Sequence, residues 1–123
     1  MSMDYSENFG KELPVPVVPS PTQAECVERI KALIKENPIV LFMKGNSQAP
    51  RCGFSANVVN ILNKFQRPFA TYDILKDSEI RNTLKEYNNW PTYPQLYINQ
   101  QFIGGNDIVS EMDLKGDLKS LIL

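Results

Sequence analysis

The spacing of apolar residues predicts alternating helices and strands from Thr22 onward. Apolar residues at helical spacing follow Thr22, which heads a possible capping box, and predict a helix that runs to about Glu36. Asn37-Pro38 ends this helix, because the residue before a proline disfavours the helical conformation. The continuous apolar run Ile39 to Met43 predicts a strand that is buried on both faces.

The alternation continues after a loop from Lys44 to Pro50. Cys52 opens a second helix, residues 68–74 predict a second strand, and Asp77 or Ser78 caps a third helix. Because a helical crossover joins the two strands, we expect them to be parallel.

The last part of the chain predicts a hairpin and a final helix. Gln95 to Ile98 and Gln101 to Ile103 flank a tight turn at Asn99-Gln100, which predicts antiparallel strands. Asp107 can cap the final helix, in which Gly116 is a possible break. The element order predicts an α/β domain over residues 22–123, with a four-stranded mixed sheet flanked by helices.

Composition excludes several classes of protein. Residues 1–21 hold four of the nine prolines and predict a disordered Pro-rich tail without a function of its own.

The net charge of -1 argues against a nucleic-acid or membrane-surface partner, and the longest apolar runs are far shorter than a bilayer requires. Two cysteines are fewer than a disulfide-stapled secreted domain normally carries, which indicates a reducing compartment.

Cys52 is the predicted reactive residue. At a helix N-terminus its thiolate meets unpaired N–H groups and the positive end of the helix dipole, and Arg51 and Lys44 supply cationic neighbours that lower a thiol pKa. Ser55 stands where a resolving cysteine would stand, so Cys52 must pair with an outside thiol or bind a ligand as a thiolate. Cys26 lies among apolar residues of the first helix, and we expect it to be core or half-buried.

Four motifs carry a family resemblance: MKG at residues 43–45, APRCGFS at 49–55, NWPTYPQL at 89–96 and GGNDI at 104–108. In this order they resemble the single-domain monothiol glutaredoxins of the CGFS class. The resemblance covers the chain from about Thr22 to its end. It implies a thioredoxin-like (glutaredoxin) fold, which agrees with the predicted order of elements.

The resemblance also implies a site for glutathione or a related low-molecular-weight thiol. Lys44 and Arg81 would bind the glycine carboxylate through charge-assisted hydrogen bonds. Tyr93-Pro94 resembles the family's cis-proline, beside which the main chain of Tyr93 would pair with glutathione. Asn106 and Asp107 would bind the γ-glutamyl end. The other binding residues implied are Phe54, Thr92 and Gly105.

A bridging [2Fe-2S] cluster is the second ligand that the resemblance implies. Such a cluster needs four ligands, commonly thiolates, and one chain of this sequence cannot supply four. The family arrangement is a homodimer, monomeric as the apo protein, in which Cys52 of each protomer and two glutathiones hold the cluster. The implied role is cluster transfer between a scaffold and recipient proteins, with a BolA-like protein as a further partner. Many relatives carry cysteine at the position of Asn106, so a second-thiol route is closed here.

Two alternatives stay open beside the cluster carrier. A glutathione-dependent oxidoreductase that removes glutathione from mixed disulfides needs no second cysteine. The loop Gly45 to Ala49 is longer than in dithiol glutaredoxins, and in the CGFS class this insertion goes with weak activity in that assay, so we expect a weak enzyme at most. The other alternative is a redox-sensing interaction module. The expected compartment is the mitochondrial matrix for a eukaryotic protein and the cytoplasm otherwise.

Overall fold

The first and third helices of the domain begin where the sequence predicts. The structure is a computed structural model that describes residues 9–16 and 22–123. Helix α1 (Gln23–Glu36) follows Thr22, whose hydroxyl accepts the N–H of Glu25 and forms half of the predicted capping box. Helix α3 (Ser78–Tyr87) is capped by the carboxylate of Asp77, after a short 3-10 turn, η2 (Ile74–Lys76).

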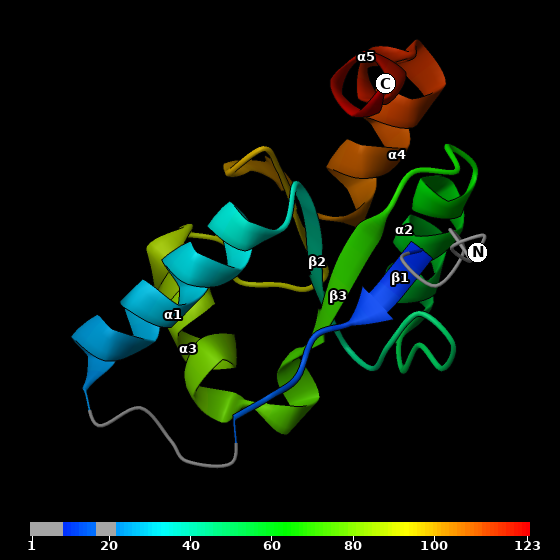
Figure 1. Cartoon of the computed structure of the whole chain (residues 1–123). Coiled ribbons are helices and arrows are strands. Elements are labelled where there is room, and N and C mark those ends of the chain that lie inside the picture. Colours follow the sequence, from blue (N-terminus) through cyan, green and yellow to red (C-terminus); the bar gives the residue numbers. More distant parts are fainter. Residues whose placement is uncertain (1–8, 17–21) are drawn as a thin grey trace, which may run out of the picture.

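The strands form one mixed sheet, drawn in Figure 1. They are β1 (Phe9–Glu12), β2 (Ile39–Met43), β3 (Phe69–Asp73), β4 (Gln95–Ile98) and β5 (Gln101–Gly104), in the spatial order β1-β3-β2-β4-β5. As predicted, β2 and β3 are parallel, and β4 and β5 are antiparallel. The hairpin turn places Asn99 and Gln100 at φ 50° and 68°, a conformation that matches the natural twist of the two strands.

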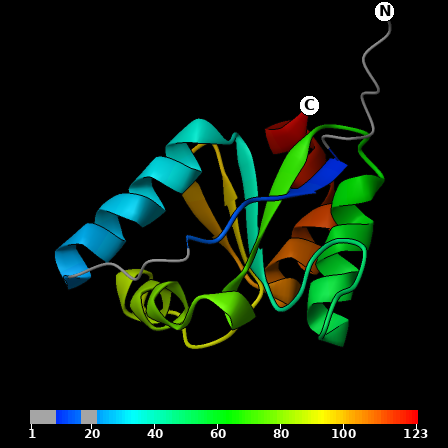
Figure 2. The same cartoon turned by 60° about the horizontal axis from the view of Figure 1, so that its bottom comes forward.

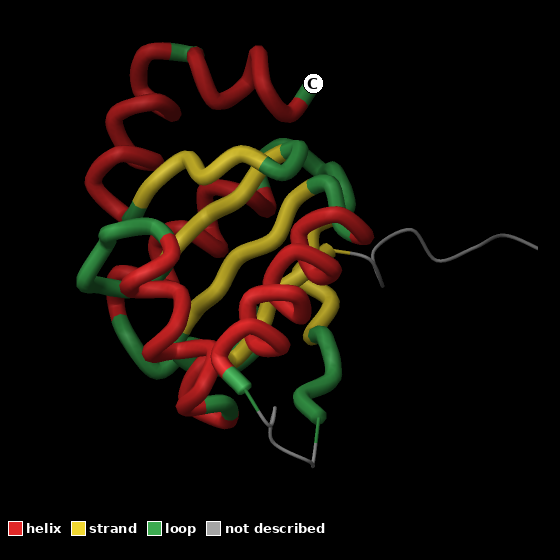
Figure 3. Tube along the Cα trace, turned by 90° about the vertical axis from the view of Figure 1, so that its left-hand side faces the viewer, coloured by secondary structure: helices red, strands yellow, loops and turns green. Residues whose placement is uncertain are grey.

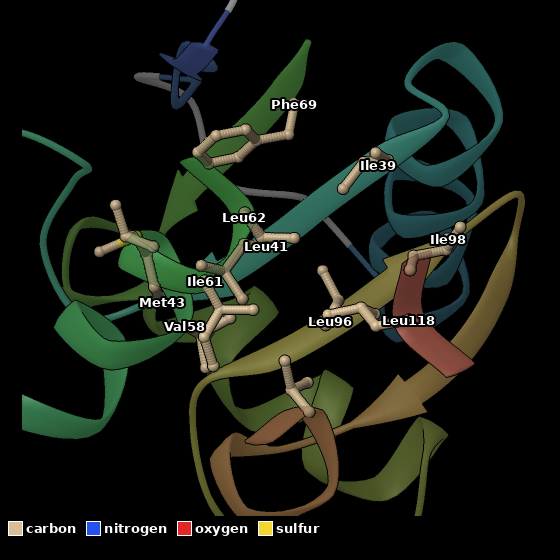
Figure 4. Packing of buried hydrophobic residues seen from close by; sticks show 12 residues of the cluster. Ile39, Leu41, Met43, Val58, Ile61, Leu62, Phe69, Leu96, Ile98 and Leu118 are labelled. Carbon is tan, nitrogen blue, oxygen red and sulfur yellow. The ribbon is translucent and has the colours of Figure 1, made fainter. Parts of the chain in front are cut away.

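Alternation along the strands divides the apolar side chains between two cores. Ile39, Leu41 and Met43 face α2 (Gly53–Asn63), α4 (Asn106–Lys115) and α5 (Asp117–Ile122), as Figure 4 shows for this cluster. Val40 and Phe42 face the opposite side, where they pack with residues of α1 and α3. Figures 2 and 3 show the sheet between these two helical layers. The continuous apolar run of β2 is therefore explained by burial on both faces.

The sheet has five strands, whereas the sequence predicted four. The additional strand, β1, comes from the segment that we expected to be a disordered tail. It pairs in parallel with β3, Phe9 packs on one core, and Leu13 and Val15 pack on the other. Pro14 and Pro16 follow the paired residues, so they remove no N–H group from the β1–β3 ladder. The remainder of the predicted tail, residues 1–8 and 17–21, lies outside the described residues.

Helix α4 begins earlier than predicted. Its N-cap is Gly105, so Asp107 lies in the first turn and is not the cap that the sequence suggested. The expected break falls at Gly116, whose φ of 81° ends α4 and is followed by α5. Within the described part of the chain, no helix combines the length and the apolar character needed to cross a membrane.

Candidate functional site

The thiol of Cys52 lies at the N-cap of α2 and is half-buried. A hydrogen bond from the backbone N–H of Ser55 is the largest influence on this thiol, and it lowers the pKa below the ordinary value. Burial opposes this effect, while the N–H of Phe54 and the charge of Lys44 lower the pKa further. Lys44 thus supplies the cation expected beside Cys52, whereas Arg51 is exposed.

Ser55, at the position of the missing second cysteine, has a structural role. Its side chain is fully buried, and its hydroxyl oxygen accepts the backbone N–H of Lys44 at 3.3 Å. The same hydroxyl forms a hydrogen bond with Cys52 that lowers the thiol pKa. The residue that removes the possibility of an internal disulfide therefore links β2 to the first turn of α2.

A groove of about 430 Å³ contains Cys52 and nearly all of the predicted site residues. Residues far apart in the sequence line it: Lys44, Cys52, Phe54, Arg81, Lys85, Trp90, Pro91, Thr92, Tyr93, Gly105, Asn106 and Asp107. Pro94 is buried and does not line the groove, but its peptide bond with Tyr93 is cis, as expected. Phe54 forms an exposed apolar wall, with 62% of its surface accessible.

Lys85 is a groove residue that the sequence reasoning missed. It lies on α3 four residues after Arg81, and residues at this spacing share one helix face. With Lys44 from the end of β2, these two residues give the groove three cationic side chains. The spacing to Arg81 was the signal that could have identified Lys85.

The segment that contains the cis bond is fixed to its surroundings by side-chain hydrogen bonds. The hydroxyl of Tyr93 donates to the carbonyl of Arg81 at 2.6 Å and joins this segment to α3. The buried amide of Gln95 donates to the carbonyls of Trp90 and Thr92 at 3.1 and 3.2 Å. The side chains of Tyr93 and Gln95 therefore fix the backbone of residues 90–93, which lines the groove.

The start of α4 also lines the groove, next to the segment that contains the cis bond. A Cβ at Gly105 would lie 3.2 Å from Nε1 of Trp90, so the absence of a side chain lets the indole pack against this turn. Asn106 accepts a hydrogen bond from the side-chain amide of Asn57 at 2.7 Å and donates to the carboxylate of Asp107 at 3.3 Å. The exposed carboxylate of Asp107 thus lies in the helix's first turn, whose backbone N–H groups have no partner within the helix.

Cys26 does not belong to this groove. It lies on α1 with 2% of its surface exposed, in the core cluster of α1, α3 and the sheet, which confirms its expected burial. Across the described ranges, no group of three or more His, Cys, Asp or Glu side chains is arranged to hold a metal ion. The chain's contribution to thiol chemistry in the groove is Cys52.

The comparisons with known proteins agree on one family. A family-wide sequence profile described as glutaredoxin matches residues 39–103. The chain is 54% identical over 95 residues to monothiol glutaredoxin-S11 of Oryza sativa subsp. japonica, a match that covers 77% of this chain but only 19% of the rice protein. It is 49% identical over 98 residues to an uncharacterized monothiol glutaredoxin ycf64-like protein of Synechocystis, covering 80% of this chain and 92% of that protein.

A solved structure supports the same assignment. The solution structure of reduced poplar apo GrxS14 is similar with a TM-score of 0.67 and 40% sequence identity, and the match covers 82% of this chain and 90% of that one. The mixed sheet with flanking helices expected from the element order is therefore that of a known fold. The profile match and the identity to these relatives show that the chain belongs to the glutaredoxin family.

Proposed function

We propose that the groove binds glutathione with its thiol beside Cys52. Lys44 and Arg81 bind the glycine carboxylate, and Lys85 adds a third positive charge on the same side. The main chain of Tyr93 pairs with the peptide as a short added strand. At the other end of the ligand, the backbone N–H groups of Asn106 and Asp107 bind the γ-glutamyl carboxylate. The side-chain carboxylate of Asp107 accepts a hydrogen bond from the γ-glutamyl amino group.

Phe54, Thr92 and Gly105 complete this proposed binding site. Phe54 covers one wall with an aromatic ring, and Gly105 leaves room for the ligand backbone to approach the helix start. The groove is lined both by three cations and by the start of α4, and two such anion-binding features match a ligand that has two carboxylates. This charge arrangement around a single activated thiol is the observation that carries the proposal.

We further propose that two chains carry a [2Fe-2S] cluster between them as cargo. The donor set fits such a cluster, because Cys52 is a half-buried thiol with a lowered pKa and thiolates are its usual ligands. The whole sequence has two cysteines and no histidine, and Cys26 is buried in the core. One Cys52 from each protomer and two glutathione thiolates then supply four ligands. Half of the ligands are exchangeable small molecules, which suits a protein that receives a cluster from a scaffold and passes it on.

A weak oxidoreductase activity is the second candidate, and the lowered pKa of Cys52 favours it. The Cys52 thiolate attacks the glutathione sulfur of a mixed disulfide, the S–S bond breaks, and the substrate leaves as a thiolate. A second glutathione thiolate then attacks the new Cys52–glutathione disulfide, which yields glutathione disulfide and restores the Cys52 thiolate. The alternative role in redox sensing, the BolA-like partner and the compartment stay predictions from the sequence.

Anaerobic reconstitution with iron, sulfide and a thiol tests the carrier proposal. Visible absorption and circular dichroism spectra would be recorded with and without glutathione, beside size-exclusion chromatography. We expect a cluster signal that requires glutathione and elutes as a dimer, is lost in Cys52→Ser and is kept in Cys26→Ser. A full cluster in Cys52→Ser would overturn the ligand assignment.

The same experiment separates the two candidate functions. A protein that stays colourless and monomeric with every thiol tested, yet turns over a glutathionylated peptide, is an oxidoreductase and not a carrier. Equal cluster loss in a folded Cys26→Ser variant would contradict the structural role given to Cys26. Binding of glutathione to the apo protein, measured by calorimetry, tests the groove independently of any cluster.

A further inference from the structure

Strand β1 contacts the loop that leads to Cys52. The hydroxyl of Ser47 donates to the carbonyl of Gly10 at 2.7 Å, and the side-chain amide of Asn46 donates to the carboxylate of Glu12 at 3.3 Å. Asn46 and Ser47 lie within Gly45 to Ala49, the part of this loop that the family resemblance marks as longer than in dithiol glutaredoxins. The strand lies before the region matched by the family profile, which begins at Ile39.

The strand is itself firmly attached to the domain. Its residues pair with β3, and the N–H of Leu13 donates to the carbonyl of Thr71 at 2.8 Å beyond the end of the strand. The carboxylate of Glu12 also pairs with Lys76 at 3.2 Å. Phe9 and Leu13 pack on opposite core clusters. The loop tip is therefore bonded to a fixed part of the sheet.

Hydrogen bonds within the loop hold it in one conformation. The N–H of Arg51 donates to the carbonyl of Lys44 at 2.9 Å, and the side-chain oxygen of Asn46 accepts the N–H groups of Gln48 and Ala49 at 3.0 and 2.8 Å. Lys44 begins the loop and Cys52 follows its end at the N-cap of α2, and both residues line the groove. A restraint at the tip is thus transmitted to the residues that face the ligand.

Gly10 allows the close approach between strand and loop. Its φ is +74°, and a Cβ built there would lie 2.5 Å from Oγ and 2.6 Å from Cβ of Ser47. Any other residue at this position pushes the loop tip away from the strand. We propose that β1 is a positioning element for the groove, which holds the loop through Gly10 and Glu12 so that Lys44 and Cys52 keep their places.

The substitution Gly10→Ala in the full chain tests this proposal. Hydrogen exchange measured by NMR reports the loop through the bonded N–H groups of Ala49 and Arg51, which we expect to exchange about tenfold faster. Gly116→Ala is the matched control, because Gly116 has a φ of +81° but nothing within 4 Å of the added Cβ. The control imposes the same backbone strain, and we expect loop exchange to stay at the wild-type rate.

Substitutions of Ser47 distinguish the hydrogen bond from the steric contact. Ser47→Ala removes only the hydrogen bond to Gly10 and should speed hydrogen exchange in the loop about fivefold. This variant should fold normally, so it tests the proposal even if Gly10→Ala fails to fold. Ser47→Gly removes the two closest atoms that an alanine at position 10 would meet and leaves only Cζ of Phe69 at 3.2 Å, so Gly10→Ala should speed loop exchange less in that background than in the wild type. Loop exchange that is unchanged in both Gly10→Ala and Ser47→Ala would overturn the proposal.

A binding measurement extends the test to the groove, and this arm rests on the proposed function. We expect glutathione affinity to fall about threefold in Ser47→Ala, but not in Gly116→Ala. Faster loop exchange with unchanged glutathione affinity would overturn the positioning of groove residues. If the wild-type protein does not bind glutathione, the proposed function fails, and the NMR chemical shift of the Cys52 amide replaces affinity as the measurement. We then expect this chemical shift to change in Ser47→Ala. An unchanged chemical shift would overturn the proposal that β1 positions the groove.

Discussion

The backbone N–H of Lys44 donates to the hydroxyl oxygen of Ser55, 3.3 Å away, and joins the end of β2 to the first turn of α2. Because the same hydroxyl and the Ser55 N–H lower the pKa of the Cys52 thiol, the bond couples the activation of this thiol to the sheet. Ser55 therefore has two partners in the groove wall, although a Cys-x-x-Ser motif suggests merely a missing thiol.

Ser55→Ala should raise the pKa of Cys52 and leave the partly buried N–H of Lys44 without this acceptor. The rate of Cys52 alkylation by iodoacetamide follows the thiolate fraction, so its midpoint should move to higher pH. The measurement is made on the apo protein in a Cys26→Ser background. Ser120→Ala, which removes a hydroxyl remote from the groove, is the control. A midpoint at the wild-type pH in Ser55→Ala would contradict the role given to the hydroxyl.

Lys44→Gln should weaken glutathione binding about tenfold, because a charge-assisted hydrogen bond to the ligand carboxylate is lost. Calorimetry at low and high salt measures this, and the variant should also depend less on salt than the wild type. Lys119→Gln removes the same charge from the exposed surface of α5 and serves as the control. Equal losses in both variants would show a general charge effect and not a contact in the groove.

Thr71→Val should stabilise the protein by about 1 kcal/mol. The hydroxyl of Thr71 is buried in β3, and among the described residues it has no hydrogen-bond partner. A methyl group of similar size removes that unsatisfied oxygen and suits a strand. Thr22→Val is the opposite case, since its hydroxyl caps α1, and there we expect a loss of about 1 kcal/mol. Urea denaturation compares the two, and a destabilised Thr71→Val protein would show that this hydroxyl has a partner.

Asp77→Asn should make stability less sensitive to acid. Burial raises the pKa of Asp77, but hydrogen bonds from the Tyr72 hydroxyl, the Ile80 N–H and Arg29 outweigh it, so the net pKa is lowered. Because the pKa of Asp77 is lower in the folded state than in the unfolded state, its charged form stabilises the fold. This stabilisation is fully present above the pKa of the unfolded state, ordinarily 3.8, and is lost as pH falls through the pKa of the folded state.

Asparagine can keep the helix cap through Oδ1, but its amide nitrogen cannot accept the Arg29 hydrogen bond that Oδ2 of Asp77 accepts, so the variant removes this bond together with the charge. At neutral pH the variant should lose roughly 2 kcal/mol, and the gap to the wild type should shrink below about pH 4 as Asp77 becomes protonated. Urea denaturation midpoints of the variant and the wild type, recorded from neutral pH to below about pH 4, measure this difference in stability. A gap that stays constant down to the lowest pH would mean that the charge of Asp77 adds nothing.

Local features of the sequence were sufficient to predict the helices, the β2–β3 and β4–β5 pairs and the position of Cys52 at a helix start. Apolar spacing, a capping threonine and a tight Asn99-Gln100 turn act within a few residues, so one segment contains the whole signal. The groove was predicted differently, through the resemblance of its motifs to a family. The structure brings nine of the ten predicted site residues to the lining of the groove, while Pro94 is buried and does not line it.

The features that sequence reasoning missed depend on distant contacts. Strand β1 has four residues, one of them a glycine, and becomes ordered by pairing with β3, whose residues follow it by about sixty positions. Its signal, Phe9 followed by Leu13 and Val15, is too short to distinguish from a Pro-rich tail. The cap at Gly105 was missed for a similar reason, since the turn is shaped by the indole of Trp90 packed against it.

Strand β1 also determines how the domain meets other protein chains. Without it, the outer edge of β3 would offer the backbone groups of a five-residue buried strand as a template for edge-to-edge aggregation. The strand that covers this edge is short, has an irregular register at Gly10 and exposes the charged residues Lys11 and Glu12. These are features by which natural sheets discourage further strands from adding. A chain that lost its first dozen residues would keep its thiol but lose this protection against insolubility.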